Sequence, residues 1–238
     1  MSWGENELER SKANKRCTSV LVSWILSVVD RTLRHEYGSN YSMQCLQSSE
    51  CIHCILSEVG IRSMIVIGDL CAAAIYAGPP PAYGWSGFWG NDHHIWVVTE
   101  YGELIDLTIA QLHLHPVWIR DDTYPIPALW WQNSDGMPSV FKYLARKWGI
   151  LTPKLPPEDM VALDRVRDNA LALCREELAQ DCQPERYTCP ILFNTIVLDY
   201  LKQSGHPWVT QAYYFQKRNI PLPAWVAQRD AALRGQDS

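Results

Sequence analysis

The chain has 238 residues, of which 47% are hydrophobic and 20% are charged, the composition of an ordinary globular protein with a full core. The formal net charge is −5, and the lysines and arginines are scattered, which excludes the basic surface that nucleic-acid binding requires. The 8 cysteines are too sparse for the disulfide framework of a small secreted domain.

The first predicted helix covers residues 5–35. Apolar side chains recur in it at steps of three and four from Leu21 to Leu33, which indicates one buried face. The apolar stretch 18–29 follows basic residues, as in a signal peptide, but no small-residue cleavage site follows it and it is too short to span a bilayer. We therefore expect a cytoplasmic protein with reduced thiols and no membrane association.

The next segments alternate between turn signals and short regular elements. The sequence Gly38-Ser39-Asn40 breaks the first helix, and a second helix is predicted over residues 43–59, ending at Gly60. Residues 63–67 are rich in β-branched side chains and predict a buried strand, which residues 72–76 extend or pair with.

A proline-rich turn at residues 78–81 leads into an aromatic loop over residues 83–90. Residues 94–99 and 104–107 then predict a hairpin, because two short apolar runs flank a turn at residues 100–102.

After Thr108 the apolar residues no longer follow a regular helical or strand period. A turn-rich loop is expected at residues 121–127 and a linker at residues 153–157. Helices are predicted over residues 139–148, 160–178 and 191–201, and the polar tail from Arg229 is expected to fray.

Three residues of these elements can form a thiol site. Cys45 falls at the start of the second predicted helix, where the helix dipole and the free N–H groups stabilise a thiolate. His94 opens one strand of the hairpin and Asp106 lies in the other. The carboxylate can then accept the Nδ1 proton and leave Nε2 to pair with the thiol. The set predicts a nucleophile, a general base and acid, and an orienting carboxylate.

The sequence around this set resembles the transglutaminase-like family, whose wider group is papain-like in fold. The matching pieces are Cys45-Leu46-Gln47-Ser48-Ser49, Gly60-Ile61-Arg62, Val66-Ile67-Gly68, His94-Ile95-Trp96 and residues 102–108. The first and third are most similar to bacterial leader peptidases of lasso-peptide pathways.

The resemblance implies an α+β fold whose papain-like core covers residues 1–120. In that core the helix of Cys45 packs on a small antiparallel sheet. Residues 121–238 are expected to form a mainly helical, Trp-rich extension packed on the core.

The resemblance implies an enzyme that transfers acyl groups through a cysteine. The leading hypothesis for its reaction is hydrolysis of a peptide or amide bond. The substrate would be a peptide or a small-molecule acyl compound, free or carrier-bound, and no cofactor is expected. An acyltransferase or cyclase that passes the acyl group to an amine would use the same residues. The alternative that is not an enzyme is a binding protein on a transglutaminase-like scaffold that has lost catalysis.

Further residues are candidates for parts of this site. The backbone N–H of Cys45 is the natural oxyanion donor, and Asn40 and Gln44 are side-chain candidates. The aromatic loop and the strand after it supply candidate residues for the substrate cleft, namely Trp85, Phe88, Trp89, His93 and Trp96.

Plainer interpretations stay open beside the triad. Cys45 could be a buried structural thiol, His93 could be the base, and Asp106 could pair with a surface arginine. The Cys51-Ile52-His53-Cys54 run lies inside a predicted helix and lacks a second pair of ligands, and the His113/His115 pair lacks a nearby third ligand. We therefore expect no metal site.

Overall fold

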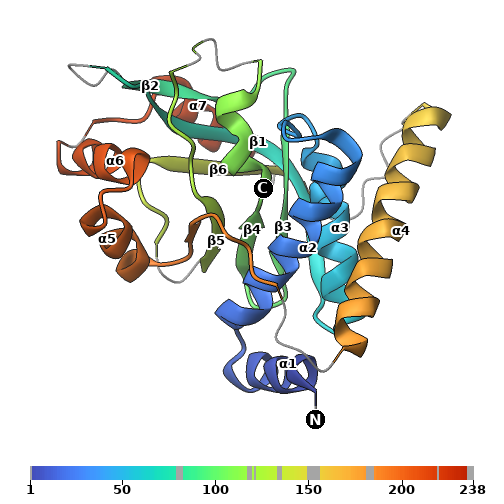
Figure 1. Ribbon diagram of the computed structural model, residues 1–238. Coiled ribbons are helices and arrows are strands. Elements are labelled where there is room, and N and C mark those ends of the chain that lie inside the picture. Colours follow the sequence, from blue (N-terminus) through green and yellow to red (C-terminus); the bar gives the residue numbers. More distant parts are fainter. Residues whose placement is uncertain are drawn as a thin grey trace.

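The structure of the chain is a computed structural model that describes residues 2–78, 83–116, 120, 122–132, 136–148, 156–180, 185–218 and 220–234. In it a curled and mostly antiparallel sheet packs against helices (Figure 1). The predicted α+β class is confirmed at this level. The predicted loop at 121–127 is described except for residue 121, and only residues 156 and 157 of the predicted linker are described.

The N-terminal region contains two helices, so the prediction of one helix over residues 5–35 is wrong. Helix α1 (Trp3–Asn14) ends at Lys15, which has a φ of 48°, and α2 (Ser19–Tyr37) begins after Thr18, whose side chain accepts a hydrogen bond from the Leu21 amide. The apolar run of α2 is explained by burial, since Leu21, Val22, Trp24, Ile25, Leu26, Val28, Val29 and Leu33 are all core residues.

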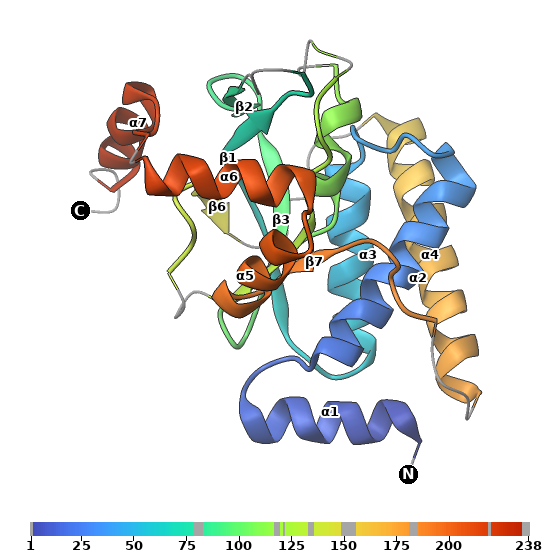
Figure 2. The same ribbon diagram turned by 60° about the vertical axis from the view of Figure 1, so that its left-hand side comes forward.

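Helix α3 (Cys45–Glu58) confirms the second predicted helix and starts at the predicted nucleophile. The chain turns away from it at Gly60, two residues after its end, where a φ of 77° is accessible to glycine at little cost. Helices α2, α3 and α4 (Pro157–Ala179) lie side by side on one side of the sheet (Figures 1 and 2). They bury one apolar face of the sheet, which includes Ile65 of β1, Val97 of β3 and Trp130 of β5.

The sheet contains β1 (Ser63–Ile75), β2 (Tyr83–Phe88), β3 (His94–Thr99), β4 (Glu103–Asp106), β5 (Ala128–Gln132), β6 (Phe141–Trp148) and β7 (Ile191–Leu192). The order is β2-β1-β3-β4-β5-β7, and β6 pairs with β1. The predicted hairpin is confirmed by the antiparallel β3–β4 pairing. The single strand β1 covers the predicted segment 63–67 and extends through residues 72–75 of the second one.

Strands β2 and β3 lie end to end along one edge of β1. Residues 66–68 pair with both β3 and β6, and residues 70–72 pair with both β2 and β6, so β6 occupies the opposite edge throughout. Residues 83–88 are therefore a strand, and the prediction of a loop over all of 83–90 is wrong. The chain leaves the edge only at residues 89–93, immediately before His94, which we call the 89–93 loop.

The C-terminal half supplies strands as well as helices. The predicted helix over residues 139–148 is wrong, because this segment is β6. Its buried residues Phe141 and Leu144 stand three apart, a spacing that imitates a helical face. Residues 191–192 form β7, and the helix predicted there begins only at α5 (Thr195–Gln203). Three strands of the sheet, β5, β6 and β7, therefore come from residues after 120, the part of the chain that was expected to form a mainly helical extension.

The other side of the sheet is covered by α5 and α6 (Pro207–Lys217), as Figure 2 shows, where Trp208 donates its indole N–H to the Ala73 carbonyl at 2.8 Å. A 3₁₀-helix, η1 (Thr108–Leu114), follows β4. Helix α7 (Ala224–Arg234) packs on β6, so the predicted fraying from Arg229 is wrong as far as residue 234, where the described tail ends.

Two contacts hold the 89–93 loop in place. Trp89 stacks on Trp225 of α7 with ring centroids 4.3 Å apart, and Arg146 of β6 donates to the Asp92 carbonyl at 2.9 Å. Arg146 also pairs with the buried Asp69 of β1, which accepts a second bond of 2.8 Å from Arg229 of α7. Helix α7 thereby connects the far end of the chain to the loop that precedes His94.

Gly68 lies where β1 closely approaches β6 and the Trp96 ring. A Cβ atom at this position would lie 2.1 Å from the Leu144 carbonyl oxygen and 2.6 Å from the Trp96 ring. Because backbone must move to relieve the first clash, Gly68→Ala is expected to lower the free energy of unfolding by about 1–3 kcal/mol. Urea unfolding measures this. Gly84→Ala is the matched control, since the nearest atom is 3.6 Å away. Equal stability of both variants would contradict the packing described here.

No helix within the described ranges is long and apolar enough to cross a bilayer.

Candidate active site

The predicted base and its carboxylate are in contact. His94 is the first residue of β3 and Asp106 is the last of β4, and the antiparallel register pairs Val97 with Ile105 and Val98 with Leu104. Both side chains are 1% exposed, and His94 Nε2 lies 2.6 Å from Asp106 Oδ2. A buried hydrogen bond of this length fixes the orientation of the imidazole ring.

The Asp106 carboxylate accepts four hydrogen bonds. Its Oδ2 receives His94 Nε2 and the Tyr143 hydroxyl at 2.8 Å. Its Oδ1 receives the Thr108 hydroxyl at 3.0 Å and the Ile109 amide at 3.1 Å. Burial alone would raise the Asp106 pKa, but the charge of His94 and these donors hold that pKa below its usual value. The carboxylate is therefore kept ionised inside the protein.

The ring nitrogens of His94 have the opposite roles to those expected from sequence. Nε2 contacts Asp106, whereas Nδ1 is buried and has no hydrogen bond of ordinary geometry to the described residues. Burial by itself would lower the His94 pKa, but Asp106 and, to a smaller extent, hydrogen bonding and charge from the Cys45 thiol raise it above the usual value. Nδ1 is thus the nitrogen left to interact with the thiol. The expected pairing of Nδ1 with the carboxylate is wrong, because sequence does not define the rotation of the ring.

Cys45 is the first residue of α3 and is partly buried at the edge of the core. Gln44, the residue that precedes the helix, makes no side-chain capping bond. The first amides of a helix have no partner within the helix itself, so those of α3 are positioned to receive negative charge. The start of α3 thus combines a thiol with donors suited to an oxyanion.

The two side-chain candidates for the oxyanion site differ in their surroundings. Asn40 accepts hydrogen bonds from the Ser42 amide and hydroxyl at 3.2 and 2.8 Å, and donates to the Leu114 carbonyl at 3.5 Å. Its amide therefore bonds to the loop between α2 and α3 and to the end of η1. Gln44 lies next to Cys45 and is half-buried. Of the two candidates, Gln44 remains the one beside the thiol.

The cleft candidates divide into two groups. Phe88 stacks on the His94 ring with centroids 5.3 Å apart and an angle of 6°, because β2 and β3 continue each other along β1. Trp96 is 2% exposed and its ring lies 6.4 Å from that of His94. Phe88 and Trp96 therefore enclose the imidazole.

The other three candidates lie outside this enclosure. Trp89 stacks on Trp225, Trp85 packs against two clusters of buried core residues, and His93 is exposed. An exposed His93 gives no support to its use as the base in place of His94.

Sequence reasoning missed Tyr143, and it considered His115 only as a metal ligand beside His113. Tyr143 comes from β6, and its ring centroid lies 6.3 Å from His94 and 5.0 Å from Trp96. His115 packs edge-on against Phe88 at 4.9 Å, and burial and the nearby His94 lower the His115 pKa. No sequence signal indicated Tyr143, because its segment was predicted to be helical. Thr108 is the last residue of the segment 102–108 that carries the family resemblance.

A cavity of about 460 Å³ lies against Trp96 and Tyr143. Its other lining residues are mostly apolar and are Val98, Leu104, Met137, Ser139, Phe141, Lys142, Ala145, Trp148 and Leu222. The cavity adjoins two rings that flank His94 and is of a size typical for small ligands.

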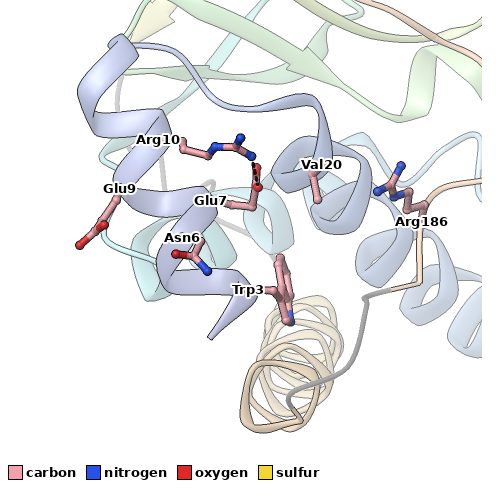
Figure 3. Close-up of a pocket in the computed structure, with 7 residues that line it drawn as sticks. All are labelled: Trp3, Asn6, Glu7, Glu9, Arg10, Val20 and Arg186. Atoms are coloured by element: carbon pink, nitrogen blue, oxygen red, sulfur yellow. Dashed lines mark hydrogen bonds and ion pairs between the residues drawn. The ribbon is translucent and has the colours of Figure 1, made fainter. Parts of the chain in front are cut away.

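A second hollow, of about 650 Å³, lies between α1, the start of α2 and Arg186 (Figure 3). Glu7 and Arg10 form an ion pair of 3.0 Å within it, as Figure 3 shows. None of the predicted site residues lines this hollow.

Across the described ranges, no three histidine, cysteine or acidic side chains come together as metal ligands. Cys51 and Cys54 lie within α3, and burial raises the pKa of both thiols.

Comparisons with known proteins give no family. No family model matches the chain, and no curated protein matches it. A crystal structure described as a genomics structure is similar with a TM-score of 0.39 and 15% sequence identity, over 65% of this chain and 77% of that one. A likeness at this score supports no conclusion about fold family or function.

Proposed function

We propose that this protein is a transglutaminase-like cysteine enzyme with a papain-like core, and that it cleaves peptide or amide bonds through an acyl-thiol intermediate. The observation that carries the proposal is the buried contact of 2.6 Å between His94 Nε2 and Asp106, which leaves Nδ1 for the Cys45 thiol. Cys45 acts as nucleophile, His94 as general base and acid, and Asp106 holds the ring.

The first half of the reaction forms the acyl-enzyme. Cys45 Sγ attacks the carbonyl carbon while His94 Nδ1 holds the proton taken from the thiol. The amides at the start of α3 stabilise the oxyanion. When the tetrahedral intermediate collapses, the C–N bond breaks and His94 gives its proton to the leaving amine.

The second half releases the acyl group. Water attacks the thioester carbonyl while His94 Nδ1 accepts a proton from it. The C–S bond then breaks, the acid leaves, and the proton returns to sulfur. An amine in place of water would give an amide, which is the transferase or cyclase alternative. Phe88 and Trp96 support either route, because they keep the imidazole away from bulk water.

The test is a panel of peptide amides, esters and thioesters incubated with the protein, with and without an added primary amine. Mass spectrometry is expected to show an acyl adduct on Cys45 and a free acid product. An amide that forms in place of the acid when amine is present would select the transferase reading.

Iodoacetamide labelling at neutral pH gives a substrate-independent check. Cys45 is expected to react faster than the exposed Cys189, and His94→Ala is expected to abolish the difference. His93→Ala is the matched control and should label as the wild type does. Equal labelling rates of Cys45 and Cys189, unchanged by His94→Ala, would sink the enzyme proposal and favour a binding protein.

A further inference from the structure

Tyr143 shares one carboxylate oxygen with His94. Its hydroxyl donates to Asp106 Oδ2 at 2.8 Å, and His94 Nε2 lies 2.6 Å from the same atom. The other oxygen, Oδ1, is occupied by Thr108 and the Ile109 amide. The carboxylate oxygen that accepts from His94 is therefore the same one that accepts from Tyr143.

The sheet brings Tyr143 to this position from a distant strand. Tyr143 pairs with Leu70 of β1, and Leu70 pairs on its other edge with Phe88, the residue that stacks on His94. The Tyr143 ring also packs edge-on against Trp96 at 5.0 Å with an angle of 73°. The ring contacts of Tyr143 with Trp96 and His94, together with its register on β1, hold the hydroxyl over Asp106.

We propose that Tyr143 is a positioning residue of the site, which sets how strongly Asp106 holds the imidazole proton of His94. Its catalytic meaning rests on the proposed function. The hydroxyl draws negative charge from Oδ2, the atom that stabilises the protonated imidazole. A weaker carboxylate lets His94 release its proton to the leaving group more readily, and the hydroxyl also keeps Asp106 ionised.

The titratable groups around His94 are few. Asp106 contacts it from β4, the Cys45 thiol acts on it from α3, and His115 acts on it from the segment after η1. Tyr143 itself faces Asp106, and burial, together with this carboxylate, raises the Tyr143 pKa well above its usual value. The hydroxyl is therefore a neutral donor at every pH at which the enzyme would work.

The test is Tyr143→Phe, which removes the hydroxyl and keeps the ring. NMR titration of ¹⁵N-labelled histidines, with the His94 signal identified by its loss in His94→Gln, is expected to show the His94 pKa rising by about one unit. Tyr37→Phe is the matched control. The Tyr37 hydroxyl is also buried, has no hydrogen-bond partner among the described residues and lies on α2, so the His94 titration should not change.

An unchanged or lowered His94 pKa in Tyr143→Phe would overturn the proposal. If that variant does not fold, 3-fluorotyrosine at position 143 decides, because it keeps the ring and makes the hydroxyl a stronger donor to Asp106 Oδ2. The His94 pKa is then expected to fall, and an unchanged or raised value overturns the proposal. Neither measurement needs a substrate. A shifted His94 pKa without acyl turnover would therefore reject the proposed function alone.

Discussion

Cys45→Ala is expected to lower acyl-transfer turnover by on the order of 10⁴-fold or more, because alanine cannot form the proposed covalent intermediate. The fold should survive the change, since Cys45 is only partly buried and lies at the edge of the core. The measurement is the initial rate on the best substrate of the panel, together with loss of the acyl adduct by mass spectrometry. The residual rate would come from the helix amides acting on bound substrate.

Cys54→Ala is the matched control for this variant. Cys54 lies on the same helix and is also partly buried, but burial raises its pKa and favours the neutral thiol. The control should keep the wild-type rate within a few-fold. Full activity of Cys45→Ala, or a loss in Cys54→Ala as large as in Cys45→Ala, would show that Cys45 is not the nucleophile.

Asp106→Asn is expected to lower the rate by on the order of 10³–10⁴-fold while changing the volume of the side chain little. The Ile109 amide can only donate, so the amide oxygen of asparagine must face it and the NH₂ group must face His94. Nε2 then becomes an acceptor, and the neutral ring carries its proton on Nδ1. An Nδ1–H next to Cys45 cannot take the thiol proton.

The measurement combines the turnover rate with the iodoacetamide labelling rate of Cys45, both of which should fall. Thr108→Val is the matched control, because it removes one donor to Oδ1 at 3.0 Å but keeps the carboxylate. We expect that variant to lose less than about tenfold, the effect of one hydrogen bond. Wild-type labelling in Asp106→Asn would contradict the assigned role of Asp106.

Local patterns were sufficient for the helix that begins at Cys45 and for the hairpin that carries His94 and Asp106. The first is marked by a broken segment before it and Gly60 after it, and the second by two short apolar runs around a tight turn. Each signal concerns residues close in sequence. The three candidate residues could therefore be named before any fold was seen.

Local patterns misled where partners are distant. The aromatic segment 83–88 resembles a loop because glycines alternate with rings, yet β1 continues far enough to pair with it. Phe141 and Leu144 imitate one face of a helix, yet β6 pairs with the opposite edge of β1. A strand of this kind is specified by the edge it joins, which its own residues do not encode.

The sequence by itself determined that a thiol at a helix start, a histidine and a carboxylate occur in the order of a triad. Only the tertiary structure decided which histidine nitrogen meets Asp106, and that Tyr143 completes the shell around that carboxylate. The physical reason is that side-chain rotation and long-range strand register depend on packing between distant segments. Periodicity along the chain does not record such packing.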